Sequence, residues 1–386
     1  MQPAPKLTSP GFRHALKIAS IDLYPLRAEG GVSPSMALGS MTSRPALLFA
    51  IEDSHGCVGW GEVWANFPNR ASLHKKHVIE DVVAPKLKGL SFSDPREAVQ
   101  ALRDQLSIYF LHVGQVRVLE HILAGIDTAL WDLALRSAGE SFAEHMGVDP
   151  QAKCYASSIN RDALEAKISK HSAYDQNRFK LKLGFGDEED IAFVERAAGL
   201  TKNDARLMVD TNQRWSRAQA QIMLKRLAPL GVQFSEEPLR ADATLADWEA
   251  LAETSTIPLA VGENVYGIDA FLALVDAGIQ YVQPDVAKWG GVSGALDLAD
   301  ALPSNAMLWP HFMGSAVGQM AALSVAAAVG GDAQCEMDVN ANALRTDLCG
   351  GALEISRGAV SLPISSGLVV PPEPDQLSRF AEGAAS

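Results

Sequence analysis

The chain has 386 residues, of which 47% are hydrophobic and 20% charged, and its 33 Lys and Arg against 46 Asp and Glu give a net charge of −13. This composition is typical of a globular protein with a sizeable core, so it excludes an intrinsically disordered chain. The acidic balance argues against nucleic acid or an anionic membrane surface as the main partner, and no apolar run approaches the roughly 20 residues that a membrane helix needs.

The first part of the chain predicts a sheet followed by helices. Strand-like runs lie at 18–25, 45–53 and 57–64. The stretch 30–44 is rich in Gly, Ser and Met and has no periodicity, which is typical of a loop. The longest helical pattern, from Val116 to Ala138, has a wide apolar face. We therefore expect an α+β capping domain over residues 1–148.

After Asp149-Pro150 the pattern changes to short β-rich runs that alternate with amphipathic helical stretches. The expected strands lie at 153–158, 178–185, 206–210, 232–237, 258–263, 280–285, 306–311 and 333–337. Strands that alternate with helices in this way are typical of a parallel barrel rather than a sandwich. The predicted fold is therefore α/β, with a TIM-type (β/α) barrel over residues 149–358. A proline-rich C-terminal segment, 359–386, is expected to return to the capping domain.

Charged residues end most of these strands, one in each strand–helix unit. They are Lys182, Asp210, Glu236, Glu263, Asp285, His311 and Glu336. The carboxyl ends of parallel barrel strands converge on one mouth, where active sites are built. We therefore expect these residues to meet in one pocket, although they are far apart in the sequence.

Three of these residues, Asp210, Glu236 and Glu263, end neighbouring strands of the expected barrel. Three carboxylates in one mouth would repel one another and raise their own pKa values, and a divalent cation removes that cost. Ligation by carboxylate oxygens alone favours Mg²⁺ or Mn²⁺ over zinc, which prefers nitrogen and sulfur. The sequence predicts a magnesium site, with Mn²⁺ as the alternative ion. The alternative without a metal is that these residues are strand-end caps or partners of nearby lysines.

Two groups are candidates for general acid–base chemistry. Lys180 and Lys182 alternate along one strand and so share a face. Two ammonium groups side by side near a metal disfavour protonation, so we expect the pKa of one of the two lysines to be depressed toward that of a working general base. Asp285 and His311 end consecutive strands, and a carboxylate that accepts from one imidazole nitrogen raises the basicity of the other. His311 is therefore the second acid/base, expected on the opposite side of the pocket from Lys182.

Further polar residues are candidates for supporting roles. Glu336 is expected to donate a hydrogen bond to a developing oxyanion, with Asp338 as a rival for this role. Asn212 follows Asp210 and is expected to bind the substrate or to support the metal ligands. Lys288 either neutralises the carboxylates or forms a structural ion pair.

In order and spacing, these motifs resemble the enolase superfamily, specifically the mandelate racemase subgroup of the mandelate racemase/muconate lactonizing enzyme family. The matching segments are KLK (180–182), VDTN (209–212), EEP (236–238), GEN (262–264), PDVAKWGG (284–291), PHFMGS (310–315) and CEMD (335–338). AGIDTALWDLALRSAG (124–139) is similar to the family's helix before the barrel. A muconate-lactonizing member would have a lysine where Asp285 stands.

The resemblance implies Lys182, supported by Lys180, as one base and a His311–Asp285 dyad as the other. It implies that Glu336 hydrogen-bonds the substrate carboxylate and enolate. The metal ligands that it implies are Asp210, Glu236 and Glu263, with Mg²⁺ as the ion. The implied reaction starts with removal of the proton α to a carboxylate.

The outcome of that reaction depends on the substrate. A β-hydroxyl would leave, and an acid sugar would become a 2-keto-3-deoxy acid. This dehydration is the leading interpretation, since most members of the subgroup are acid-sugar dehydratases. Without a β-hydroxyl, reprotonation on the opposite face by the second base would give racemisation or epimerisation. An alternative of another class is a non-catalytic binding protein that keeps a metal site.

Specificity is expected from the loop 30–44 and from the segment around Trp64 to Asn66. The loop is poor in charged residues, which favours a less polar carboxylate, with Trp64 and Met313 among the candidate walls of the substrate pocket. The expected partner is a small-molecule carboxylate, with neither nucleic acid nor membrane. The resemblance implies a homo-oligomer, a dimer or an octamer. The cysteines lack metal-site spacing and the N-terminus lacks a signal-peptide pattern, so we expect a cytoplasmic protein.

Overall fold

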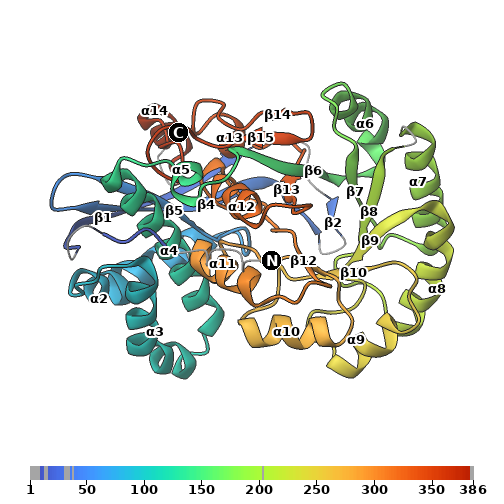
Figure 1. The fold of residues 1–386 in the computed structure, drawn as a ribbon, viewed down its shortest axis with the longest axis horizontal. Helices are drawn as coiled ribbons and strands as arrows, with labels where there is room; N and C mark the ends of the chain where they lie inside the picture. Colours follow the sequence, from blue (N-terminus) through green and yellow to red (C-terminus); the bar gives the residue numbers. More distant parts are fainter. Residues whose placement is uncertain (1–8, 13–15, 30–34, 37–38, 202–203, 383–386) are drawn as a thin grey trace.

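The computed structural model of the chain describes residues 9–12, 16–29, 35–36, 39–201 and 204–382 (Figure 1). The capping domain contains an antiparallel sheet in the order β1-β4-β5 and a β2–β3 hairpin. Its strands are β1 (Ile18–Glu29), β2 (Ser35–Met36), β3 (Gly39–Ser40), β4 (Ser43–Asp53) and β5 (Val58–Val63). The hairpin lies within the predicted loop 30–44, of which residues 30–34 and 37–38 are outside the described residues.

Helices follow the capping sheet. They are α1 (Ala71–Val78), α2 (Ala84–Lys88), α3 (Pro95–His112), α4 (Val116–Ala138) and α5 (Phe142–Met146), with a π-helical turn at Ile79–Val83. The long helix α4 lies directly against β5, because β5 carries glycines at the contact. A Cβ atom at Gly61 would lie 2.1 Å from the carbonyl oxygen of Gly125 in α4, so only glycine permits this approach.

The second part of the chain is a parallel barrel, at the right of Figure 1 with helices on its outside. Its strands are β6 (Gln151–Ile159), β7 (Arg178–Lys182), β8 (Arg206–Asp210), β9 (Val232–Glu236), β10 (Leu259–Val261), β11 (Tyr281–Val282), β12 (Met307–Leu308) and β13 (Cys335–Asp338). They pair in chain order from β6 to β12, and β13 pairs with β6. The amide of Glu336 donates to the carbonyl of Pro310 at 3.0 Å, which joins β13 to the chain after β12. The predicted TIM-type barrel with a capping domain is confirmed.

Helices connect the barrel strands. They are α6 (Leu164–Ser172), α7 (Asp187–Leu200), α8 (Arg217–Leu227), α9 (Leu245–Ala252), α10 (Ile268–Asp276), α11 (Gly291–Ala301) and α12 (Ala316–Val329), followed by α13 (Ala343–Thr346). The last predicted strands are longer than the observed ones: β10, β11 and β12 end at Val261, Val282 and Leu308. The polar residues predicted at their ends lie two or three positions further on, in the loops.

The barrel interior is built in layers. A buried cluster of Tyr155, Met208, Phe234, Ala260, Tyr281 and Trp309 fills it. Side chains alternate along a strand, so a residue two positions later faces the same interior at a higher level. Two positions after Met208 and Phe234 come Asp210 and Glu236. The apolar layer therefore closes the floor beneath a polar layer at the carboxyl ends of the strands.

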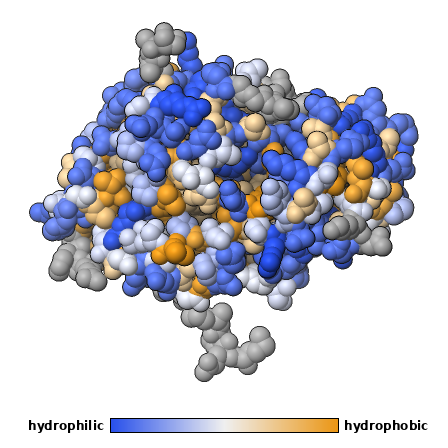
Figure 2. Space-filling model, turned by 90° about the horizontal axis from the view of Figure 1, so that it is seen from above, coloured by the Kyte–Doolittle hydropathy of each residue, from blue (hydrophilic) through white to orange (hydrophobic). Residues whose placement is uncertain are grey.

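The C-terminal segment returns along both parts of the molecule. Strand β15 (Ala359–Ser361) pairs with β6 and with β14 (Ile355–Ser356), and α14 (Pro374–Phe380) follows. Glu382 then forms an ion pair of 2.6 Å with Arg27 of β1. Within the described residues, no helix combines the length and the apolarity that crossing a membrane requires. Figure 2 shows polar residues over much of one face, with apolar residues in scattered groups.

Candidate active site

The ends of three adjacent barrel strands place charged side chains side by side. In the parallel register Lys182 of β7 is opposite Asp210 of β8, and Asp210 is opposite Glu236 of β9. All three are buried, with no more than 3% of any of them exposed. The strand pairing itself thus brings residues that are far apart in sequence to one level of the barrel mouth.

The carboxylates of this group are hydrogen-bonded to cations and amides. Asp210 accepts from Lys182 and, at 3.2 Å, from Nδ2 of Asn212. Glu236 accepts from Lys180 at 2.6 Å and from Nε2 of Gln283 at 2.7 Å. Burial would raise the pKa of Asp210, but the lysines hold it below its ordinary value. Burial prevails at Glu236 and raises its pKa to about 7, against the opposing effect of Lys180.

The predicted dyad is formed in the structure. Nδ1 of His311 lies 2.9 Å from Oδ2 of Asp285, and Nε2 lies 2.8 Å from Oε2 of Glu263. Asp285 is itself fixed, since its Oδ1 accepts from the amide of Ala287 at 2.8 Å. Burial would lower the pKa of His311, but Glu263, Glu336 and Asp285 together raise it well above its ordinary value. The imidazolium is therefore stabilised on both nitrogens.

The depressed pKa predicted for one of the two lysines is not found in this arrangement, where carboxylates bind both of them. Burial alone would lower the pKa of Lys180, but Glu236 and Glu336 raise it well above its ordinary value. The pKa of Lys182 is also raised, because the effect of Asp210 outweighs burial and the neighbouring Lys180. The carboxylates that bind the two lysines directly therefore outweigh the mutual repulsion of the ammonium groups.

The structure distinguishes Glu336 from its rival Asp338. Oε1 of Glu336 lies 2.8 Å from Nζ of Lys180, and Oε2 has no hydrogen-bond partner and lies 3.5 Å from Nε2 of His311. Asp338 instead pairs with Arg44 at 2.8 Å and with Arg345 at 3.5 Å. Glu336 therefore belongs to the polar cluster, whereas Asp338 fastens the capping strand β4 to the barrel.

The donor set fits a hard divalent cation. Asp210 and Glu236 are buried carboxylates and Glu263 is a half-buried one with 17% of its side chain exposed. Glu237 adds a fourth carboxylate, whose Oε2 has no hydrogen-bond partner. Burial and the neighbouring Glu263 raise the pKa of Glu237 well above its ordinary value. Among the described residues no three His, Cys, Asp or Glu side chains stand in a metal-binding arrangement. In the structure, ammonium and imidazolium groups hold oxygens that such an ion would take.

Of the residues predicted to bind substrate, Lys288 lies next to Glu263, and Trp64 lies next to Lys288. Nζ of Lys288 lies 3.2 Å from Oδ1 of Asn264 and 3.9 Å from Oε2 of Glu263, and it stands 4.9 Å from the centre of the Trp64 ring. Trp64 is half-buried, and Met313 is buried in the loop after His311. This contact with Glu263 fits both interpretations of Lys288, neutralisation of the carboxylates and a structural ion pair.

Sequence reasoning missed three polar residues of the cluster. Ser157 donates to Glu336, Gln283 donates to Glu236, and Asn264 donates to Glu263 at 2.9 Å. Each of them lies near an apolar barrel residue or a strand-end acid in the sequence. Ser157 and Gln283 come two positions after Tyr155 and Tyr281 of the interior layer, so the alternation that places Asp210 would also have placed them.

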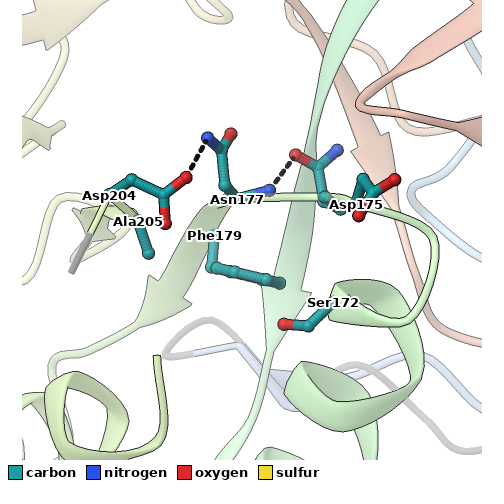
Figure 3. Close-up of a pocket in the computed structure, with 7 residues that line it drawn as sticks. Ser172, Asp175, Asn177, Phe179, Asp204 and Ala205 are labelled. Atoms are coloured by element: carbon teal, nitrogen blue, oxygen red, sulfur yellow. Dashed lines mark hydrogen bonds between the residues drawn. The ribbon is translucent and has the colours of Figure 1, made fainter. Parts of the chain in front are cut away.

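A separate small cavity of about 90 Å³ lies at the amino end of β7, near Ser172, Asn177 and Phe179 (Figure 3). The amide of Asn177 donates to Oε1 of Gln176 at 3.0 Å, and its side chain lies 3.5 Å from Asp204. The polar groups that line this cavity hydrogen-bond to one another, and the cavity lies at the end of β7 opposite to the end that carries Lys182. We therefore assign the chemistry to the carboxyl ends.

Comparison with known families gives two matches that together cover most of the chain. Residues 28–147 match the model of the mandelate racemase / muconate lactonizing enzyme N-terminal domain. Residues 163–376 match the enolase C-terminal domain-like model. These are the two parts that the structure shows as capping domain and barrel.

Curated relatives and solved structures are similar over nearly the whole chain. A D-galactarolactone cycloisomerase of Agrobacterium fabrum is 29% identical, covering 87% of this chain and 91% of the relative. An arabinonate dehydratase of Saccharolobus solfataricus is 27% identical, covering 91% of this chain and 95% of the relative. A mandelate racemase/muconate lactonizing enzyme structure from Bordetella bronchiseptica has a TM-score of 0.86 at 34% identity, over 95% and 99%. A racemase structure from Streptomyces coelicolor, solved with bound magnesium, shares the fold with a TM-score of 0.83 at 22% identity, covering 94% of this chain and 99% of that one.

Proposed function

Because the chain belongs to the mandelate racemase/muconate lactonizing enzyme family of the enolase superfamily, we propose that its polar cluster removes the proton α to a carboxylate. The chain is an enzyme of the lyase or isomerase kind, as its dehydratase, cycloisomerase and racemase relatives are. One observation carries the proposal: Lys182 and an aspartate-paired His311 are buried around one set of carboxylates. A non-catalytic binding protein would not need both bases.

The residues divide the reaction between them. Lys182 and His311 come from β7 and the loop after β12, and β6 and β13 lie between them in the barrel. They are proposed to exchange protons with the α-carbon from different sides. Lys180, held by Glu236 and Glu336, supplies positive charge where the enediolate oxygens develop. Glu336 then holds the substrate carboxylate and enolate by a hydrogen bond.

Asp210, Glu236 and Glu263 are the proposed ligands of Mg²⁺, with Mn²⁺ as the alternative ion. The bound ion would act as a Lewis acid that lowers the energy of the negative charge on the carboxylate oxygens. Asn212 holds Asp210 from the side, and Lys288 balances the charge of Glu263. The bases themselves need only hold and move protons.

We propose dehydration of an acid sugar to a 2-keto-3-deoxy acid as the reaction. In this reaction one base removes the α-proton and His311, whose pKa is raised, protonates the leaving β-hydroxyl. Racemisation or epimerisation of a 2-substituted acid is the second candidate. It is favoured by two bases from separated strands and by the apolar Trp64, whose ring centre lies 4.9 Å from Nζ of Lys288.

Incubation of candidate acids in D₂O with Mg²⁺ tests the proposal, with α-deuterium followed by NMR and 2-keto product by semicarbazide. We expect exchange with at least one acid, and keto product if that acid has a β-hydroxyl. Lys182→Ala and His311→Asn should each abolish turnover, whereas Lys153→Ala, an exposed lysine of β6, should leave it unchanged. No exchange across sugar acids, aldarates and 2-aryl acids would favour a binding protein.

The same family membership suggests the remaining properties. We propose a homo-oligomer, a dimer or an octamer, located in the cytoplasm. Size-exclusion chromatography with light scattering measures the first of these directly, and a monomer would contradict it.

A further inference from the structure

The chain around the end of β5 carries a contact between the capping domain and the loop of His311. Glu62 is buried, with 3% of the residue exposed. Its carboxylate accepts from the amide of Ser315 at 3.0 and 3.1 Å, from the hydroxyl of Ser315 at 2.5 Å and from the amide of Gly318 at 3.0 Å. These donors form the start of α12, which begins directly after the loop that carries His311.

Glu62 is held by these donors and not by a basic residue. No Lys, Arg or His of the described part of the chain forms an ion pair with Glu62, and a helix N-terminus stabilises a carboxylate through its free amides. Burial raises the pKa of Glu62 to about 7, against the effect of Ser315. Burying an acid without a countercharge lowers the stability of the folded protein, so stability does not explain why Glu62 lies here.

Two residues that follow Glu62 at alternate positions also contact the barrel loops, as hydrogen-bond donors. The amide of Trp64 donates to the carbonyl of Ala287 at 3.3 Å, in the loop that carries Asp285. Nδ2 of Asn66 donates to the carbonyl of Met313 at 2.6 Å, in the loop that carries His311. The segment 62–66 therefore holds both loops of the dyad from the capping side.

The loop after His311 packs closely against Glu62 and leaves no space for a side chain at its glycines. A Cβ atom at Gly314 would lie 2.4 Å from Glu62 and 2.6 Å from the ring of Phe312. A Cβ atom at Gly318 would lie 2.3 Å from the same ring. Phe312 directly follows His311 and is 1% exposed. A displacement of the Glu62 carboxylate would therefore be transmitted through Phe312 to the backbone of His311.

We propose that Glu62 is a positioning residue for His311. Through Glu62 the capping domain orients His311, whereas the orientation of Lys182 does not depend on it. Lys182 lies on β7, and its contacts are to Asp210. The expected effect on reaction rates rests on the proposed function. The expected effect on the position of His311 rests only on the contacts of Glu62.

The kinetic test separates the steps that depend on each base. The variants Lys182→Ala and His311→Asn first show which step depends on which base. For a racemase the two steps are the α-deuterium exchange of each enantiomer. For a dehydratase they are α-deuterium exchange and loss of the β-hydroxyl. Glu62→Gln keeps the size of the side chain but lacks the second oxygen acceptor. We expect the step that depends on His311 to slow about tenfold or more, since small displacements of a catalytic group have large effects. The step that depends on Lys182 should stay within about twofold.

Asp127→Asn is the matched control. Asp127 is also a buried acid of the capping domain at the start of a barrel helix, and it accepts from the amide of Ser293 at 2.9 Å. It does not contact the loop of His311, so both steps should keep the rates of the unmodified protein. Equal slowing of both steps by Glu62→Gln, or slowing of neither, would overturn the proposal, as would the same selective loss in Asp127→Asn.

A structural measurement keeps the inference separate from the proposed function. If the unmodified protein exchanges no acid, the proposed function fails, and crystal structures of the protein and of Glu62→Gln then decide the inference. Nε2 of His311 lies 2.8 Å from Glu263 here. Loss of this contact in Glu62→Gln, with Lys182 still on Asp210, would support the proposal. An unmoved His311 would overturn it.

Discussion

At the scale of single residues, charge balance explains the candidate active site. Lys180, Lys182 and His311 are each in contact with a buried carboxylate, and each has a raised pKa although burial acts in the opposite direction. That these residues lie at or just after the carboxyl ends of barrel strands could be predicted from the sequence. The direction of the lysine pKa shift could not, because it depends on which oxygen each ammonium group reaches.

Asp285→Asn should test the dyad at this scale. The amide keeps the shape but no longer fixes the Nδ1–H tautomer of His311 or stabilises the imidazolium. We expect the His311-dependent step to slow about a hundredfold or more, as for other aspartate-oriented histidines. The measurement is enantiomer-resolved α-deuterium exchange. Asp297→Asn, in a partly exposed ion pair with Arg96 outside the cluster, is the control and should leave the rate unchanged.

At the scale of elements, alternation along the strands determines which residues the barrel brings together. Met208 and Asp210, or Phe234 and Glu236, face the same interior because side chains alternate, so this part of the site could be predicted from one strand at a time. The role of Glu62 could not. Its partner Ser315 is 253 positions away, and no pattern within β5 indicates α12.

Gly318→Ala tests how closely the start of α12 packs against Phe312 and Glu62. The added methyl would lie 2.3 Å from the Phe312 ring, so we expect a loss of about 2 kcal/mol of unfolding free energy. Gly199→Ala in α7 has no heavy atom within 4 Å of the added methyl and should gain up to about 1 kcal/mol. Urea unfolding of both variants measures the difference. A loss that is the same in both would contradict the packing account.

At the scale of the whole molecule, buried polar contacts join the capping domain to the barrel. Arg44 pairs with Asp338, Glu62 with Ser315, and Asp127 with Ser293. The two-part fold and its order could be predicted from the change of pattern near Asp149-Pro150. These contacts between the parts could not, because each depends on how the finished surfaces meet.

Asp127 makes stability depend on pH. Burial raises its pKa from 3.8 to about 7 in the folded protein, so its protonated form is favoured by folding. Its contribution is complete below pH 4, is lost as the pH rises from about 4 to about 7, and is constant above, with a slope of at most about 1.4 kcal/mol per pH unit. Asp127→Asn should remove this slope. Urea unfolding between pH 4.5 and 8 measures it, and parallel curves for both proteins would contradict it.

Mg²⁺ should stabilise the whole protein if the three carboxylates bind it. Binding to the folded state alone raises the unfolding temperature with ligand concentration. We expect a saturable rise in the thermal unfolding midpoint, reversed by EDTA and absent in Glu263→Gln. A rise of the same size in Glu263→Gln would place the ion elsewhere.

The central claim is that one metal-binding pocket presents Lys182 and His311 to the same carbon. A crystal structure with Mg²⁺ and a bound carboxylic acid tests it most directly. The account predicts the ion on Asp210, Glu236 and Glu263, and the α-carbon between Nζ of Lys182 and Nε2 of His311. An ion bound to other residues, or an α-carbon within reach of neither base, would contradict it.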